Sequence, residues 1–327
     1  MSLSFHKRMS LSSLGECGLI NRVTRPVSDQ KVIVGIGDDC AVLKYNRTHY
    51  ELLTTDTLVE GDHFKREWFT AFQVGRKAVV SNVSDILAMG GFPKYMLISL
   101  SLPLTTTIHW VEELYKGIYG QCDTYNIKLI GGNTTHGEKI VITITLVGYV
   151  QKNNLRLRSA AKVGDYIGVT GFLGGSAAGL AVLKANIPGY VESYVEPMTV
   201  SPRLAHTITP FVHAMIDVSD GLASEVGHIC EASMVGAVVY KDKIPLADTT
   251  KEDARALQRD PIEFALYGGE DYQLVFTVAP NRVKYLKHFK GCYFVGEIVD
   301  KKERMWLVDN GKKTPLGSGY VHFKKQN

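Results

Sequence analysis

Five short segments of this sequence place an acidic residue beside Gly, Ser or Thr: GIGDDC, TTDT, NVSD, DVSDG and GGED. Each segment ends an apolar run, where a carboxylate is costly unless a positive group meets it. Carboxylates and hydroxyls without a nearby cluster of Cys or His favour magnesium over zinc. Magnesium bound in this way usually carries substrate phosphates. The pattern therefore predicts a metal-assisted enzyme that acts on phosphates.

The DVSDGL segment carries the strongest of these signals. Asp217 is expected to end a buried strand, and Ser219 to cap the helix that follows. Capping explains one of these groups but not Asp217, and three hard oxygens within four residues suit magnesium. We therefore expect metal or phosphate contacts here. The other segments are weaker individually, because Asp after Gly is common in turns, and GGED could equally be a turn with a solvated Glu.

Two glycine-rich segments resemble phosphate-binding loops without matching them. Gly132 and Gly137 have the spacing of a P-loop, but Glu138 follows where that motif needs Lys. The turn at 171–175 follows a predicted strand and could bind an anion at a helix N-terminus. It lacks the G-x-G-x-x-G order, so a tight turn is the preferred interpretation and a nicotinamide cofactor is not expected. An isolated histidine such as His63 is usually structural.

The composition is that of a globular protein with room for two domains. The chain has 327 residues, 45% of them hydrophobic and 21% charged, with a net charge of +4. Its basic residues are spread out, so nucleic-acid binding is not expected. Five cysteines occur without a CxxC pair, which favours free thiols in the cytosol over a disulfide framework. No apolar stretch is long enough to span a membrane and no secretion signal is evident, so we expect a cytoplasmic protein without membrane contacts.

Helices and strands alternate between these segments. In the first half, the pattern predicts a short helix before residue 30, helices at 71–89 and 108–125, and strands at 32–36, 41–44, 51–55, 95–102, 128–130 and 139–150. In the second half, it predicts helices at 176–185, 205–214, 221–232, 254–267 and 281–289, and strands at 166–170, 214–218, 235–240, 273–278 and 294–298. The strand at 51–55 is expected to end at Asp56, and the strand at 128–130 at Gly131. The first half is therefore predicted to be α+β, and the second α/β or α+β.

Together, the segments resemble the thiamine-monophosphate kinase family within the aminoimidazole-ribonucleotide-synthetase-like superfamily. The resemblance covers nearly the whole chain, in order and with the family's spacing. Relatives that make selenophosphate or aminoimidazole ribonucleotide share the architecture but not the GIGDDC, TDTLVEGDHF and GGEDY set. The matching stretches are GECGLI, GIGDDCAVL, TTDTLVEGDHF, NVSDILAMG, LIGGNTTHG, LRSAAKVGD, IDVSDGL, YGGEDYQL and GYVHF.

The resemblance implies a two-domain fold and a phosphoryl transfer. An N-terminal α+β domain, residues 1–150, would bind ATP and magnesium, and its sheet would form a barrel with that of a second subunit in a homodimer. A C-terminal α/β domain, residues 151–327, would complete the active site in the cleft between the domains. The implied reaction moves the γ-phosphoryl group of ATP to thiamine monophosphate, giving thiamine diphosphate and ADP, the last step of thiamine diphosphate biosynthesis.

The resemblance also assigns roles to individual residues. The catalytic residues would be Asp56, Asp217 and Asp220. Several magnesium ions would be held by Asp39, Thr54, Thr55, Asp56, Asp85, Asn133, Asp217 and Asp220. ATP would be contacted by Tyr115, Gly132, Asn133, Arg158 and Ser219, and thiamine monophosphate by His63, Glu270 and Tyr320. The family has Asp where this chain has Asn133, so one metal ligand keeps its oxygen but loses its charge.

Two other functions remain open at this point. The chain could bind nucleotide and magnesium without transferring phosphate, with Asn133 as the defect. The same scaffold could instead act on another acceptor, as in the synthesis of a purine precursor or of selenophosphate. In the preferred interpretation the acceptor is already an anion. Positioning and charge neutralisation, rather than a strong general base or covalent catalysis, would then supply the rate.

Overall fold

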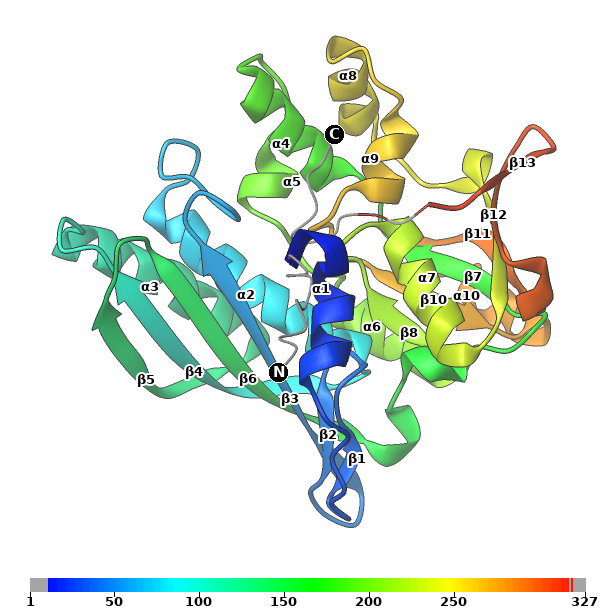
Figure 1. The fold of residues 1–327 in the computed structure, drawn as a ribbon, viewed down its shortest axis with the longest axis horizontal. Coiled ribbons are helices and arrows are strands. Elements are labelled where there is room, and N and C mark those ends of the chain that lie inside the picture. The colour runs from blue at the N-terminus through cyan, green and yellow to red at the C-terminus, as the bar shows by residue number, and fades with distance from the viewer. Residues whose placement is uncertain (1–10, 318, 320–327) are drawn as a thin grey trace, which may run out of the picture.

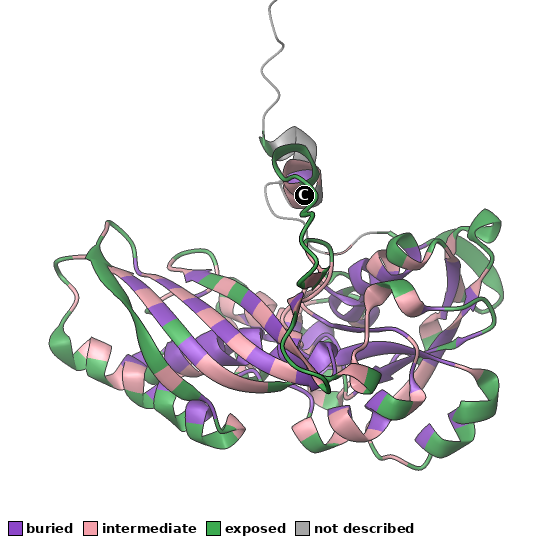
Figure 2. Cartoon of the chain, turned by 90° about the horizontal axis from the view of Figure 1, so that it is seen from below, coloured by how far each residue is buried: buried purple, intermediate pink, exposed green. Residues whose placement is uncertain are grey.

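Two mixed β-sheets organise the chain in the computed structural model, which describes residues 11–317 and 319 (Figure 1). The strands of the first sheet are β1 (Val32–Val34), β2 (Ala41–Lys44), β3 (His49–Val59), β4 (Phe92–Leu102), β5 (Lys128–His136) and β6 (Val141–Gln151). They lie in the order β1-β2-β3-β6-β4-β5, and only β4 and β5 pair in parallel. Alternating side chains of this sheet enter the core, as the banding of its strands shows (Figure 2).

The helix α2 (Ala71–Ala88) lies between the two sheets and is almost entirely buried. Thr70 and Gln73 form a capping box at its start, which satisfies free N–H groups of the first turn. The helix α3 (Ile108–Tyr125) begins at the Thr107 cap and packs along α2. Because α2 contacts both sheets, a polar side chain on its buried faces needs a partner or a cavity.

The second sheet and its helices follow in the rest of the chain. Its strands are β7 (Tyr166–Thr170), β8 (Met215–Asp217), β9 (Gly236–Tyr240), β10 (Leu274–Val278), β11 (Cys292–Val299), β12 (Met305–Asp309) and β13 (Lys312–Pro315). They lie in the order β13-β12-β9-β11-β7-β10-β8, with β9 and β12 parallel. The other helices are α1 (Leu11–Val23), α4 (Gly175–Ala185), α5 (Glu192–Val195), α6 (Pro202–Ile208), α7 (Leu222–Ser233), α8 (Asp248–Ala256), α9 (Pro261–Tyr267) and α10 (Val283–Leu286). Two 3-10 turns, η1 (Lys152–Asn154) and η2 (Arg158–Ala160), precede β7.

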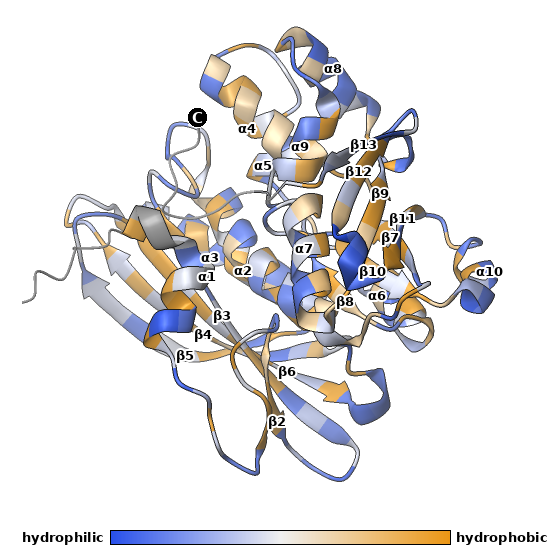
Figure 3. Cartoon of the chain, turned by 45° about the vertical axis from the view of Figure 1, so that its right-hand side comes forward, coloured by the Kyte–Doolittle hydropathy of each residue, from blue (hydrophilic) through white to orange (hydrophobic). Residues whose placement is uncertain are grey.

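Both faces of the second sheet are buried at β7, β8 and β10, and most of its strands are apolar (Figure 3). Leu274, Phe276 and Val278 of β10 join the core that also contains α2 and the first sheet. Val275, between them, belongs to a second core with residues of α7 and α9. The two halves of the chain therefore share one continuous core around α2, and side chains that face each other across it are held by packing.

Most predicted elements are confirmed, and those at 41–44, 108–125 and 166–170 have the predicted bounds. The predicted end of β3 at Asp56 was wrong, because the strand continues to Val59. The predicted end of β5 at Gly131 was also wrong, because the strand runs on to His136.

Other errors concern the second half of the chain. The single helix expected at 254–267 is two helices, α8 and α9, because Pro261 starts α9 behind an Asp260 cap. The helix expected at 281–289 is only the short α10, and the one at 205–214 is α6 followed by a 3-10 turn. The elements α5, β12 and β13 were not predicted. Within the described part of the chain, no helix combines the length and the apolar character needed to cross a membrane.

Candidate active site

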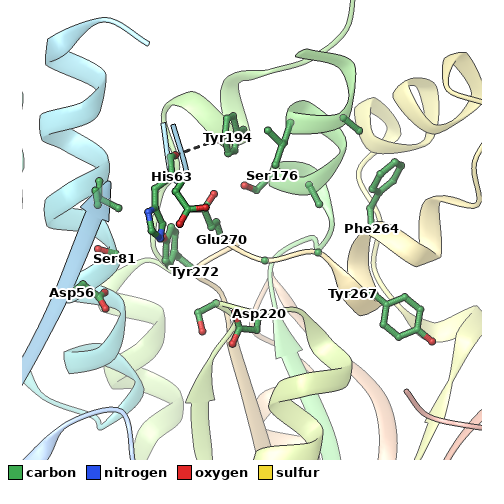
Figure 4. A pocket seen from close by; sticks show the side chains of 18 of the residues that line it. Asp56, His63, Ser81, Ser176, Tyr194, Asp220, Phe264, Tyr267, Glu270 and Tyr272 are labelled. Atoms are coloured by element: carbon green, nitrogen blue, oxygen red, sulfur yellow. Dashed lines mark hydrogen bonds between the residues drawn. The ribbon is translucent and has the colours of Figure 1, made fainter. Parts of the chain in front are cut away.

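A cavity of ≈ 860 Å³ lies beside α2, with walls from both halves of the chain (Figure 4). Asp56 and Ser81 lie on one side of it, Tyr267 lies on the other, and His63 and Glu270 are grouped together between them. The predicted site residues that line this cavity are Asp56, His63, Asp85, Asp217, Ser219, Asp220 and Glu270. Segments far apart in sequence thus meet in one chamber.

Three carboxylates converge at the edge of this cavity. Asp39, Asp85 and Asp217 each place one oxygen within 4.8 Å of the other two. They come from the loop before β2, from α2 and from the end of β8. Ser84 donates a hydrogen bond of 2.6 Å to Asp217, and Thr54 donates one to Asp85. Neighbouring hydroxyls therefore orient two of the three carboxylates.

The negative charge of the carboxylate cluster is only partly balanced by nearby cationic side chains. Burial first, and then repulsion between carboxylates, raises the pKa of Asp85 and Asp217 well above the usual value. Arg158 offsets part of this charge, because its Nη2 lies 2.5 Å from Asp39 Oδ1. Asp38 adds a further carboxylate, and burial raises its pKa to about 7. Asp39 Oδ2 is buried and has no hydrogen-bond partner among the described residues. A divalent cation that takes oxygen ligands fits this set of donors.

Asp56 and Asp220 line the same cavity in different settings. Asp56 lies within β3, where burial raises the pKa of its carboxyl group. Asp220 precedes α7, and its backbone N–H donates to Glu225 Oε1 at 2.8 Å. The N-cap of α7 is Gly221, without a side-chain cap, so the prediction that Ser219 caps this helix was wrong. Glu225 reaches back to the helix start instead, since it lies in the first turn.

The loop 268–272 delivers Glu270 into the cavity. The Glu270 N–H donates to the Ser219 carbonyl at 2.8 Å, which joins this loop to the one after β8. A Cβ atom at Gly269 would lie only 2.1 Å from the Ser219 carbonyl oxygen, so this approach requires glycine. Glu270 and Tyr272 have φ values of 65° and 49°, in the left-handed region that non-glycine residues seldom occupy. Such strain is typical of functional loops.

His63 lies next to Glu270 and is held through its ring and its backbone (Figure 4). Its ring Nδ1 accepts a hydrogen bond of 3.1 Å from the Val59 N–H. Its carbonyl oxygen accepts hydrogen bonds from Lys77 Nζ and Tyr194 Oη, both at 3.2 Å. The position of this histidine is therefore fixed from three sides.

Lys77 was not predicted as a site residue. Lys77, Ser81 and Asp85 recur on α2 at intervals of four, so they share one face of the helix. Ser81 and Asp85 line the cavity, and Lys77 contacts Glu270 at its edge. The apolar periodicity of the sequence predicts α2. The polar residues Lys77, Ser81 and Asp85, spaced by four on an otherwise apolar helix, are the sequence signal that this face lines a site.

Asp271 was also given no role by the sequence patterns. Its carboxylate accepts hydrogen bonds from the N–H groups of Gly174 at 2.6 Å and Ser176 at 3.2 Å, at the start of α4. Burial raises the pKa of this carboxyl group to about 7. The glycine segment 171–175 is a tight turn, with Gly174 at φ 81°, and the anion at this helix start is supplied by the chain itself.

Gly132 and Asn133 lie on the edge strand β5, outside the cavity lining. Strand pairing aligns Asp56 with Ile144, Ile98 and Gly132 in turn across the sheet. Three strand spacings of about 4.8 Å each separate Asp56 from Gly132 by roughly 14 Å. Asn133 therefore cannot share an ion with Asp56 within one chain.

Three more of the predicted residues lie elsewhere. The Thr55 hydroxyl donates to the Ile144 carbonyl at 3.0 Å, on the face of β3 opposite Asp56. Tyr115 lies on α3, with its ring centroid 6.1 Å from that of Tyr119, and does not line the cavity. Tyr320 lies outside the described residues.

The fold and the site together match one class of proteins. The family described as "AIR synthase related protein, N-terminal domain" matches residues 37–150, and its C-terminal counterpart matches residues 162–307. This class has a two-domain α/β fold, as predicted, and its sheets are mixed. The hydrogenase maturation protein HypE of Escherichia coli shares the fold alone, with a TM-score of 0.68 at 20% identity over 82% of this chain and 85% of that one.

Closer similarity points to one branch of the class. The thiamine-monophosphate kinase of Aquifex aeolicus is 38% identical over 322 residues, 96% of this chain and 100% of that protein. The enzyme of the same name from Escherichia coli (strain K12) is 35% identical over 94% of this chain and 98% of that protein. A solved structure described as "AaThiL complexed with AMPPCP and TMP" has a TM-score of 0.85 at 34% identity and covers 96% of this chain and 99% of that one. This chain belongs to the thiamine-monophosphate kinase family.

Proposed function

We propose that this chain transfers the γ-phosphoryl group of ATP to thiamine monophosphate, giving thiamine diphosphate and ADP. Its family and the AMPPCP and TMP bound to a relative of 34% identity support this reaction. The observation that carries the proposal is the cluster of Asp39, Asp85 and Asp217 at the edge of a cavity that also holds His63 and Glu270. Such a chamber can accommodate phosphates at one end and an acceptor at the other.

Magnesium is the cation that we propose for the carboxylate cluster. Asp39, Asp85 and Asp217 would be the main ligands, with Asp56 and Asp220 beside them as further ligands and catalytic residues. When bound, magnesium would neutralise the charge that two phosphates bring together. Asp39 Oδ2, which has no hydrogen-bond partner among the described residues, supports this assignment, since a buried oxygen without a partner is costly. Thr54, whose hydroxyl donates to Asp85, would orient that ligand.

The side chains of this site have mainly a positioning role in the proposed reaction. The acceptor is a phosphate monoester and an anion near neutral pH, so no strong general base is needed. Arg158 and Ser219 would contact the ATP phosphates, and His63 and Glu270 would hold the acceptor in line with them. Holding two reactants in an attack geometry can supply much of a rate enhancement.

Four further assignments remain proposals from the family resemblance. Tyr115 and Gly132 would contact ATP, and Tyr320 would contact the acceptor. Asn133 would contact ATP and a magnesium ion, and its distance from Asp56 supports an ion separate from the carboxylate cluster. Thr55 would be a metal ligand on the face of β3 opposite Asp56, three strands away from Asn133 in the sheet.

We further propose that residues 1–150 and 151–327 act as domains and that the first sheet forms a barrel with that of a second subunit. The face of this sheet opposite α2 supports a subunit contact, because Leu97 on it is 44% exposed. The described cysteines Cys40, Cys122, Cys230 and Cys292 are free thiols, which supports a reducing compartment. The mass of the purified protein in solution tests the dimer.

The reaction is tested by coupling ADP formation to a panel of acceptors. We expect turnover with ATP, magnesium and thiamine monophosphate, and none with thiamine or selenide in its place. Product analysis should find one thiamine diphosphate for each ADP. Tight binding of ATP and thiamine monophosphate without any turnover would instead support a binding protein that has lost transfer activity.

A further inference from the structure

A fully buried lysine lies at the acceptor end of the cavity. The side chain of Lys77 on α2 has 0% exposure, and its Nζ lies 2.8 Å from Glu270 Oε2. The same Nζ lies 3.2 Å from the His63 carbonyl oxygen. It also lies 4.1 Å from the ring centroid of Tyr194 and 5.2 Å from that of Phe69. One carboxylate, one carbonyl and two aromatic rings therefore surround this ammonium group.

A cation in this place is not required by the packing of α2. Burial lowers the pKa of Lys77, and the Glu270 carboxylate opposes that change. A buried charge persists only when close partners compensate for its lost hydration. Its neighbours on the helix, Val74 and Ala78, are apolar core residues that an aliphatic side chain would match equally well. The polar partners that the structure gives Lys77 are Glu270 and His63, which both belong to the proposed acceptor site.

We propose that Lys77 is a positioning residue for the acceptor substrate, holding the Glu270 carboxylate and the His63 backbone at a set separation. This inference rests on the proposed function, in which His63 and Glu270 contact thiamine monophosphate. Three segments meet at the ammonium group: the loop after β3, helix α2 and the loop after α9. Lys77 thus links the two halves of the chain at the site itself.

The effect on the reaction follows from preorganisation. Glu270 has a left-handed backbone, so its loop depends on surrounding contacts to keep the carboxylate in place. With Lys77 present, the acceptor meets a carboxylate that is already oriented, and less ordering is needed on binding. Removing the ammonium would also leave Glu270 without its cation. Within the described part of the chain, the hydrogen bonds of Lys77 go to two residues of the acceptor site, His63 and Glu270, and to none assigned to ATP. The Michaelis constant of the acceptor should therefore respond, and that of ATP should not.

The experiment compares Lys77→Met and Lys77→Gln with the wild-type enzyme. We expect the KM for thiamine monophosphate to rise at least about tenfold in Lys77→Met. The KM for ATP should stay within about twofold, because the interaction with ATP is unchanged. A second measurement is the calorimetric affinity for thiamine monophosphate in the presence of AMPPCP and magnesium. In a double-mutant cycle, the variant that combines Lys77→Met and Glu270→Gln should bind thiamine monophosphate no more weakly than the poorer single variant, because both residues act through one contact.

Arg76→Met is the matched control. Arg76 lies next to Lys77 on α2, and its Nη1 pairs with Glu196 Oε2 at 2.9 Å, away from the cavity lining. This variant should alter the melting temperature but neither Michaelis constant. The proposal would be overturned if the KM values for thiamine monophosphate and ATP rose equally, or if the Lys77 variants behaved like Arg76→Met. It would also be overturned if the effects of Lys77→Met and Glu270→Gln were additive, or if both Lys77 variants failed to fold. If the wild type shows no turnover, the proposed function fails, and the calorimetric comparison still tests Lys77 separately.

Discussion

Ser84 on α2 donates a hydrogen bond of 2.6 Å to Asp217 at the end of β8, and both side chains are buried. The helix packs on the first sheet, whereas β8 is an edge strand of the second. This bond therefore joins the two halves of the chain at the carboxylate cluster. It also sets the direction of a carboxylate that we assign to magnesium.

Replacing Ser84 tests whether this hydroxyl orients a metal ligand. Ser84→Ala should raise the magnesium concentration for half-maximal rate by about tenfold, the usual effect of losing a hydrogen bond to a ligand. The measurement is a magnesium titration at saturating ATP and acceptor. Ser201→Ala is a suitable control, since Ser201 makes no side-chain cap at the start of α6. An unchanged requirement in Ser84→Ala would argue against the orienting role.

Replacing Asp217 should affect turnover and stability in opposite directions. Asp217→Asn should lower turnover by orders of magnitude, because it removes charge from the proposed magnesium site. Without magnesium, the melting temperature should rise, since the variant relieves the repulsion from Asp39 that raises the pKa of Asp217. Asp56→Asn should show the same loss of turnover. Near wild-type rates at limiting magnesium would contradict the assignment of either residue.

Asp271 should make stability depend on pH. Its pKa rises from 3.8 to about 7 on folding, so the folded chain binds the proton more tightly than the unfolded chain. This contribution is fully present below the unfolded pKa and is lost as pH rises toward about 7. Asp271→Asn should therefore gain stability relative to the wild type as pH rises from about 4 to 7, with little further change above. Urea unfolding of both proteins across this range measures the difference, and a constant difference would contradict the prediction.

Asn133 should reveal whether β5 contributes a metal ligand. An amide oxygen attracts magnesium less than a carboxylate does at the same distance. We therefore predict that Asn133→Asp lowers the magnesium concentration for half-maximal rate. Because Asn133 is about 14 Å from Asp56 by strand spacing, the change should add to that of Ser84→Ala rather than depend on it. A titration in which the Asp variant needs as much magnesium or more would show that Asn133 is not a weakened ligand.

The sequence predicted those helices and strands whose buried residues recur at one regular spacing along the chain. The bounds of α3 follow from its apolar stripe and the Thr107 cap, both visible in the sequence. The sequence pattern predicts that β3 ends at Asp56. In the structure the strand continues, because Asp56 faces the cavity while Thr55 faces the opposite side. A charged residue inside a strand is stable when its face opens on a polar chamber, and no local pattern reports such a chamber.

The glycines of β5 show a similar limit. The sequence pattern predicts that Gly131 and Gly132 end a strand, whereas in the structure they lie within β5 and allow β4 to come close. A Cβ atom at Gly132 would lie 1.9 Å from the Ile98 carbonyl oxygen. Glycine is suited both to a turn and to a strand that lies very close to its neighbour. Which of the two it forms depends on the neighbouring strand, which the local sequence does not show.

The order and residue types of the acidic segments were enough to identify the family and to nominate seven residues that line the cavity. Chemistry constrains which side chains can hold a cation and phosphates. Which carboxylates share a site was not visible in the sequence. Asp39, Asp85 and Asp217 meet because α2 packs between two sheets, and Asn133 is set apart by the width of one sheet. The partners of Lys77 were equally hidden, because Glu270 is 193 positions away along the chain. Electrostatic and hydrogen-bond energies depend on distance in space, and packing alone sets that distance.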